Sequence, residues 1–233
     1  FYGDARMSVF AVRWAGDGMT EPSRVDRMLA TADLALRLGK VNRATFHPDG
    51  TPESDTTHTV MLGWIAVAVA SRLNAHTWND ETRLKFDIGK VATYALVHDA
   101  AEAYCGDTVT IGIDAAGKEA KRLREEAAVK AIEESVVFPF LAHILRMYEE
   151  QADRESRFVR YLDKVLPKLT HIMNGGAALR TLGFTADTAR AAHEAQIADL
   201  RKQYAGEWWL DVVEMDLISV CLTTEELMRR GER

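Results

Sequence analysis

The sequence predicts an all-α protein, and three observations support this fold class. Apolar residues recur three and four positions apart along most of the 233-residue chain, which is the spacing of one face of a helix. No segment alternates between apolar and polar residues in the way that a half-buried strand requires. Helix-breaking residues are few, with 15 glycines and 5 prolines.

The N-terminal part begins with a well-marked helix and a loop. Residues 23–38 form the first predicted helix, because Ser23 is a favourable N-cap and Gly39 follows the last turn. Residues 41–55 contain two prolines and a glycine, so we expect a loop there. Residues 60–70 form an apolar run of 11 residues. A membrane span needs about 18 or more, so this run is expected to lie in a buried core helix.

The later helices are predicted from the same periodicity. Opposite charges at i, i+4 spacing in residues 119–135 indicate a helix that faces solvent. Pro167 lies inside another predicted helix, where its ring is expected to produce a kink. After the first helix, the predicted helices span residues 56–73, 82–104, 119–135, 139–151, 153–173, 185–204 and 212–230.

We expect a single domain over residues 1–233. Hydrophobic residues make up 47% of the chain, which is enough for one substantial core. No repeat and no linker divides the sequence. We expect a helical core over about residues 25–175, an N-terminal extension of residues 1–22, and C-terminal helices over residues 176–233 that pack on the core.

Composition excludes several classes of function. The net charge of −6 argues against stable nucleic-acid binding, which usually requires a basic domain. Cys105 and Cys221 form neither a zinc-binding Cys-x-x-Cys motif nor a disulfide framework. Without a membrane span or a targeting segment, we expect a cytoplasmic protein. The exposed helices and the tryptophan pair Trp208 and Trp209 permit a homodimer or a higher homo-oligomer.

The segment TYALVHDAAEAYCGDT, residues 93–108, concentrates ionisable groups next to an apolar sequence. Burial of such groups is costly unless they are paired or bind a metal. His98 and Glu102 are i, i+4 and share a helix face. Adjacent residues point about 100° apart, so His98 and Asp99 converge on one ion only at the edge of that face. The alternative is a solvated acidic helix end with Asp107 in a turn.

Two residues elsewhere are compatible with the same site, and each has a simpler explanation. His58 lies just inside the helix that follows the loop, where it can be a core or capping histidine. Asp163 lies in an amphipathic helix, where Lys164 or Arg160 can pair with it. An imidazole nitrogen and a carboxylate oxygen are also suitable ligands for divalent transition metals. The residues alone leave both explanations open.

The combination of these residues resembles the HD-domain metal-dependent phosphohydrolases. Their pattern is a His, then a His-Asp pair, here 40 residues later, and then a distant Asp. ESDTTHT around His58 is similar to the family's Glu-x-x-x-x-His-Ser/Thr segment. HDAAEAYCGDT is similar to its His-Asp-Ala-x-Glu-x-x-x-Gly-Asp block. Arg43, 15 residues before His58, matches a phosphate-binding arginine of the bacterial 5'-deoxynucleotidases and phage deoxynucleotide triphosphohydrolases.

The resemblance covers about residues 25–175 and implies an HD-domain helical bundle with additional C-terminal helices. It implies one divalent ion, which can be Mn, Co, Fe, Ni, Zn or Mg. Such an ion polarises a phosphoryl oxygen and activates a bound water. Only His143 lies where binuclear members have further histidine ligands, so we expect a single ion. The implied ligands of the ion are His58, His98, Asp99 and Asp163.

The resemblance also implies roles for catalytic and substrate-binding residues. Glu102 would handle the proton of the attacking water, as a carboxylate general base or acid does. Asp107 would support Glu102 or orient the leaving sugar oxygen. Arg43 would bind the substrate phosphate. His47, Lys118 and Lys121 are further candidates for phosphate contacts.

These assignments predict an enzyme that acts on a small-molecule nucleotide. The loop before His58 holds few basic residues beyond Arg43, which favours a 5'-nucleotidase acting on deoxynucleoside monophosphates. A deoxynucleoside triphosphate triphosphohydrolase would use the same ligands. Two functions without catalysis also fit the sequence, namely a nucleotide-binding protein and a helical interaction module without metal. Family members often have a Trp beside the phosphate-binding Arg, whereas Ala44 follows Arg43 here, so the details of the substrate pocket do not carry over.

Overall fold

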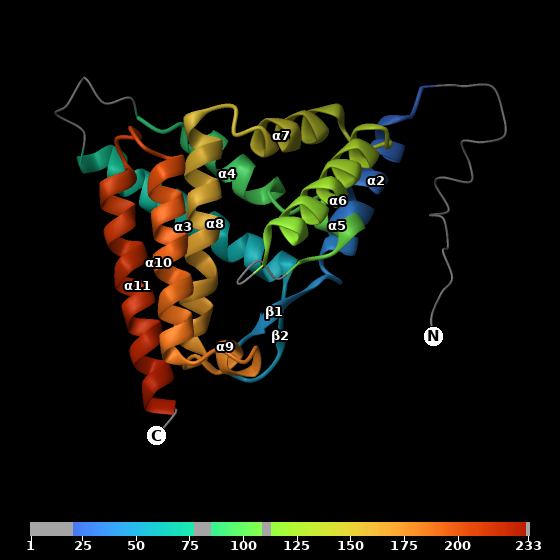
Figure 1. The fold of residues 1–233 in the computed structure, drawn as a ribbon. Helices are drawn as coiled ribbons and strands as arrows, with labels where there is room; N and C mark the ends of the chain where they lie inside the picture. The colour runs from blue at the N-terminus through green and yellow to red at the C-terminus, as the bar shows by residue number, and fades with distance from the viewer. Residues whose placement is uncertain (1–20, 77–84, 109–112, 232–233) are drawn as a thin grey trace, which may run out of the picture.

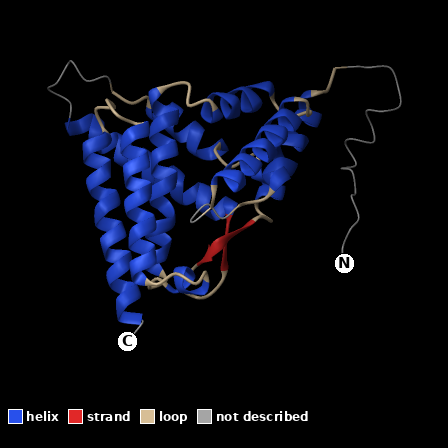
Figure 2. Cartoon of the chain, in the orientation of Figure 1, coloured by secondary structure: helices blue, strands red, loops and turns tan. Residues whose placement is uncertain are grey.

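The computed structural model describes residues 21–76, 85–108 and 113–231. These residues form helices and one two-stranded hairpin, so the all-α prediction is confirmed (Figures 1 and 2). The helices are α2 (Arg24–Leu38), α3 (Asp55–His76), α4 (Ile88–Val97), α5 (Glu102–Cys105), α6 (Ala115–Glu133), α7 (Pro139–Glu149), α8 (Arg154–Met173), α9 (Ala177–Thr181), α10 (Ala186–Gln203) and α11 (Leu210–Gly231). None of the helices in this part of the chain has the length and apolar content of a membrane span.

The main core lies where α3, α4, α8 and α11 pack on one another. Helix α8 is central, with α10 and α11 beside it in Figure 1. Trp209, at the start of α11, is fully buried and lies edge-on to Phe158 and Tyr161 of α8. The C-terminal helices are therefore part of the same core as the helices that carry the candidate ligands.

A second hydrophobic cluster lies under α2, α6 and α7. Its centre contains Ile132 of α6 and Leu145 of α7, both fully buried. The cluster also includes Ala100 and Ala101 of the turn between α4 and α5. The second cluster therefore packs against the turn that carries His98 and Asp99.

The predicted loop over residues 41–55 is wrong, because most of the segment forms an antiparallel hairpin. Strand β1 (Asn42–Phe46) pairs with β2 (Pro52–Ser54). The turn between them contains Gly50, whose φ of +84° favours glycine. The two strand residues that face inward are polar, Thr45 and Glu53, so the hairpin lacks the apolar–polar alternation from which strands are recognised.

The continuous helix predicted over residues 82–104 is also wrong. Helix α4 ends at Val97, a tight turn covers residues 98–101, and α5 begins at Glu102. In the turn, the amide of Ala100 donates to the carbonyl of Val97 at 2.9 Å, an i→i−3 bond that tightens the backbone. Residues 82–84 of the prediction lie outside the described residues. The helix predicted over residues 153–173 is present as α8, which continues through Pro167.

Candidate metal centre

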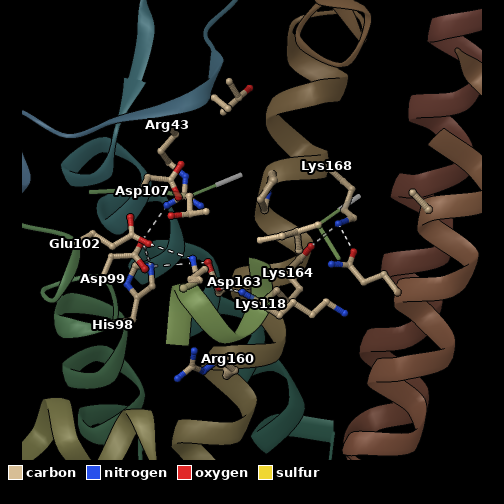
Figure 3. Close-up of a pocket in the computed structure, with 18 of the residues that line it drawn as sticks. Arg43, His98, Asp99, Glu102, Asp107, Lys118, Arg160, Asp163, Lys164 and Lys168 are labelled. Atoms are coloured by element: carbon tan, nitrogen blue, oxygen red, sulfur yellow. Dashed lines mark hydrogen bonds and ion pairs between the residues drawn. The ribbon is translucent and has the colours of Figure 1, made fainter. Parts of the chain in front are cut away.

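Four side chains from three parts of the fold form one compact cluster. His58 is on α3, His98 and Asp99 are in the turn after α4, and Asp163 is on α8. One ligand atom from each residue lies within 4.8 Å of every other. Figure 3 shows His98 and Asp99 facing Asp163. The structure thus brings together all four of the ligands that the family resemblance implies.

The two histidines are held in the orientation that a metal ligand requires. Nδ1 of His98 donates to the carbonyl of Ala95 at 2.9 Å, so Nε2 of the neutral ring keeps its lone pair. This buried Nε2 lies 2.8 Å from Asp99 Oδ2 but finds no hydrogen-bond partner. A nitrogen and an oxygen that approach closely without a hydrogen bond fit two ligands aimed at a shared cation. The donor set therefore suits a divalent ion such as Zn, Mn, Co or Fe.

His58 is oriented by a carboxylate to which the sequence motifs assign no role. Its Nδ1 lies 3.0 Å from Glu53 Oε1 on β2, and both side chains are fully buried. Its Nε2 lies 3.0 Å from Asp163 Oδ1. A carboxylate behind a ligating histidine fixes the ring and makes it a stronger ligand. Glu53 is the glutamate of the Glu-x-x-x-x-His-Ser/Thr segment noted in the sequence, and the fold supplies its role.

Replacement of Glu53 by Gln is expected to weaken metal binding by roughly tenfold to 100-fold, the usual effect of losing a carboxylate behind a ligating histidine. Competition with a chelator of known affinity measures the change. The exposed Glu134→Gln variant is the matched control and should bind metal like the wild type. Unchanged affinity in Glu53→Gln would show that Glu53 only anchors the hairpin.

Arg43 connects the hairpin to the cluster. Its Nη1 donates to Asp99 Oδ2 at 2.9 Å and to Asp55 Oδ1 at 3.1 Å. Its ion pairs are with these two carboxylates, and neither Asp49 nor Glu53 pairs with it. Burial opposes the charge of Arg43, but the surrounding carboxylates, Asp99 first, hold its pKa above the usual value. Asp55, the first residue of α3, was not anticipated, although acidic residues favour helix N-termini.

Glu102 lies beside the cluster with an unused oxygen. It begins α5 and is buried, its Oε1 lies 3.7 Å from Lys121 Nζ, and its Oε2 has no hydrogen-bond partner. Burial, and then the negative charge of Asp99, raises the pKa of Glu102 well above its usual value. After α5, Gly106 has a φ of +71°, and the turn it allows lets Asp107 line the same cavity.

A cavity of about 480 Å³ opens on the cluster. Lys118 of α6, which the sequence suggested as a phosphate contact, lines it. Lys164, which was considered only as a partner of Asp163, also lines it and lies 2.6 Å from Asp163 Oδ2. His47 does not line it. The amide of His47 is bonded within the hairpin turn to the carbonyl of Thr51 at 2.9 Å, and the structure gives His47 no place at the site.

The other residues considered from the sequence lie outside the cluster. His143 is exposed on α7 and is not part of the cluster. Arg160 pairs with Glu149 at 2.8 Å and lies over the ring of Tyr148, so it does not neutralise Asp163 directly. Trp208 packs against Phe86. Among the described residues, two groups could therefore hold a metal ion: this His/Asp cluster, and an acidic group of Asp55, Asp99 and Glu102 that shares Asp99 with it.

Comparison with known proteins identifies the family. A family model described as the HD domain matches residues 35–204, which is most of the chain. The chain therefore belongs to the HD-domain family. This confirms the family resemblance that the sequence motifs indicated. A search of the curated proteins finds no match.

Solved structures share the fold. A predicted metal-dependent phosphohydrolase from Magnetospirillum magnetotacticum MS-1 is 24% identical with a TM-score of 0.60, covering 88% of this chain and 97% of that one. A conserved hypothetical protein from Pyrococcus furiosus is 21% identical with a TM-score of 0.55, covering 84% and 98%. The PH0347 protein from Pyrococcus horikoshii OT3 is 23% identical with a TM-score of 0.53, covering 85% and 99%.

Proposed function

We propose that this chain is a divalent-metal-dependent 5'-nucleotidase that releases phosphate from deoxynucleoside monophosphates. One observation carries the proposal: three of the candidate ligands, His98, Asp99 and Asp163, line the same cavity as Arg43 and Glu102. The fourth, His58, is buried behind them, with its Nε2 3.0 Å from Asp163 Oδ1. Its volume of about 480 Å³ is within the usual range for small-molecule sites. HD-domain membership, and the name of the Magnetospirillum protein, support the phosphohydrolase reaction in general. The nucleotide substrate is our inference.

Each group of candidate residues has its own role in the proposed reaction. His58, His98, Asp99 and Asp163 would hold the ion, which supplies Lewis-acid polarisation of the phosphate and an acidified water. Arg43 uses only Nη1 for its two carboxylates, so Nη2 and Nε remain to bind phosphate oxygens. In the reaction, a bond from water oxygen to phosphorus forms and the bond from phosphorus to the 5' oxygen breaks. Glu102 takes the water proton or gives a proton to the departing 5' oxygen.

A second candidate is a deoxynucleoside triphosphate triphosphohydrolase. The observation that favours it is the number of lysines around the cavity, because Lys118, Lys121 and Lys164 all line it. The sequence alone placed few basic residues near Arg43, and the fold supplies these from α6 and α8. A non-catalytic nucleotide sensor is less well supported, because it does not require a buried Glu102 with one oxygen left without a hydrogen-bond partner.

A product assay separates these candidates. The purified protein is incubated with deoxynucleoside mono-, di- and triphosphates in the presence of Mn, Co or Zn, and the products are resolved by ion-exchange chromatography. The 5'-nucleotidase proposal predicts a nucleoside and inorganic phosphate from the monophosphates. Release of tripolyphosphate from triphosphates, without monophosphate hydrolysis, would favour the second candidate. Metal binding without turnover of any of these compounds would favour the sensor.

Replacement of Arg43 by Lys is expected to lower kcat/KM by roughly tenfold or more, because an ammonium cannot reproduce the planar, multiple contacts of a guanidinium. Metal content should persist, because Lys keeps a positive charge near Asp99. Steady-state kinetics and metal analysis of this variant check both statements. Wild-type kcat/KM on the best nucleotide would exclude a phosphate-binding role, and loss of metal would show that Arg43 mainly positions Asp99.

A further inference from the structure

The cavity continues well beyond the cluster of candidate ligands, into a space between α8 and α10. On α8 the lining residues follow one face, from the cluster toward the C-terminus of the helix: Asp163, Lys164, Pro167, Lys168 and His171. On α10 the lining includes Gln196 and His193. We call the part bordered by Lys168, His171, His193 and Gln196 the distal pocket. The reaction proposed above uses none of these four residues.

Lys168 is a buried cation without a carboxylate partner among the described residues. Its Nζ donates to the backbone carbonyl of Lys164 at 2.9 Å and to the side-chain oxygen of Gln196, both of which are neutral. An ammonium has three N–H donors, so one remains for a ligand. Burial lowers the pKa of Lys168 to about 8. A buried charge held only by neutral acceptors is costly, and a bound anion would offset that cost.

A second unsatisfied group lies one turn further along α8. Nδ1 of His171 is buried and has no hydrogen-bond partner, and only 8% of the residue is exposed. His193, across on α10, uses its Nδ1 for Glu225 of α11 at 3.0 Å, so that carboxylate is occupied. Asp199, the other acid along this wall, is exposed to solvent. The distal pocket therefore presents the Lys168 ammonium and a free ring nitrogen of His171, and no unpaired buried carboxylate among the described residues of its wall.

The distal pocket is set apart from the reacting phosphate. Lys168 is five residues after Asp163, which places it about 7.5 Å further along the helix axis at 1.5 Å per residue. Neighbouring phosphates of a di- or triphosphate would remain near the lysines around the cluster, Lys118 and Lys164 (Figure 3). An anion at Lys168 is better matched by a group on the far side of the sugar.

We propose that the distal pocket binds a second phosphate group of the substrate, carried on the 3' side of the sugar, with Lys168 as its charged partner. This inference rests on the proposed function for the group at the metal cluster, which is the 5' phosphate. The class of substrate is then a deoxynucleoside 3',5'-bisphosphate, in addition to the monophosphate. No change in the chemistry is required, since the same 5' phosphorus–oxygen bond is broken.

The kinetic test compares deoxyadenosine 3',5'-bisphosphate with dAMP on the metal-loaded protein. The wild type should prefer the bisphosphate in kcat/KM. In Lys168→Met the ratio of the two values should fall roughly tenfold or more, the loss expected for one charge-assisted hydrogen bond. Lys202→Met, which removes an exposed lysine of α10, should keep the wild-type ratio. An unchanged ratio in Lys168→Met, or an equal loss on both substrates, would overturn the proposal. So would a preference for dADP or dATP that Lys168→Met abolishes.

A labelling test needs no active enzyme and no variant at Lys168. The wild-type protein is treated with acetic anhydride, and acetylation of each lysine is quantified by peptide mass spectrometry with and without inorganic phosphate. A bound anion holds the proton on Lys168, so phosphate should slow its acetylation, with Lys202 unaffected, and should still do so in Arg43→Lys. If no nucleotide is hydrolysed, the proposed function fails and this protection still decides whether the pocket binds phosphate. If phosphate does not slow the acetylation of Lys168, or if Lys168 is never acetylated, the proposed anion binding in the distal pocket is wrong. Protection without a kinetic preference for the bisphosphate would assign the pocket to free phosphate and would reject the substrate assignment.

Discussion

Replacement of Glu102 by Gln is expected to reduce turnover by roughly 100-fold or more, the usual contribution of a general acid or base. The amide has nearly the same shape but can neither take the proton of water nor supply one to the leaving oxygen. Metal content and fold should persist, because Glu102 is not one of the four ligands of the His/Asp cluster and belongs instead, with Asp55 and Asp99, to the second group that could hold an ion. Single-turnover kinetics at saturating substrate, together with metal analysis, measure the effect.

The matched control for this experiment is Glu125→Gln. Glu125 also lines the cavity and contacts the same lysine, with its Oε1 3.1 Å from Lys121 Nζ. It belongs to neither of the two groups that could hold a metal ion. If Glu125→Gln and Glu102→Gln reduce turnover equally, the effect comes from Lys121 and not from proton transfer at Glu102. Loss of metal together with turnover would instead make Glu102 a ligand.

Replacement of Asp163 by Ala is expected to remove the metal and to reduce turnover by roughly 1,000-fold or more, because a catalytic ion contributes several kcal/mol to the transition state. Asp163 is the one candidate ligand supplied by α8, and His58 and His98 both lie near its Oδ1, at 3.0 and 3.8 Å. Elemental analysis of the purified variant and initial rates with added metal measure both losses.

Two comparisons make the Asp163 result interpretable. Asp216→Ala, an exposed position on α11, should behave like the wild type. Circular dichroism should show that Asp163→Ala keeps its helices, because removal of a buried carboxylate does not by itself break α8. A variant that retains one ion per chain would reject Asp163 as a ligand and would leave the ion pair with Lys164 as its role.

The helices could be predicted from the sequence because the buried faces of most of them are apolar and helical in period. Helix α8, with buried residues such as Phe158, Val159 and Leu162, is an example. The hairpin could not be predicted in this way, because its inward residues, Thr45 and Glu53, are polar. The break after Val97 was missed for another reason: residues 98–101 contain neither glycine nor proline, so only the backbone hydrogen bonds show the turn.

The residues of the metal centre could be proposed from motifs, whereas their partners required the fold. The pairings of Arg43 with Asp55 and of His58 with Glu53 bring the hairpin against α3. Lys168 was not noticed in the sequence because an isolated lysine in an amphipathic helix normally faces solvent. Its burial depends on α11, which packs against both α8 and α10 and so places Gln196 beside Lys168, an arrangement that no local pattern encodes.

The candidate ligands are far apart in the sequence, so an ion that binds them would affect the stability of the folded chain. His58 and Asp163 are 105 residues apart in sequence and meet at 3.0 Å. An ion held by the four candidate ligands would act as a removable cross-link between α3, the turn after α4, and α8. Any ligand that binds only the folded chain adds its binding free energy to the stability of the fold. The free energy of unfolding would therefore increase with the concentration of available metal. A chain without metal would lose this cross-link as well as the ion that the reaction requires.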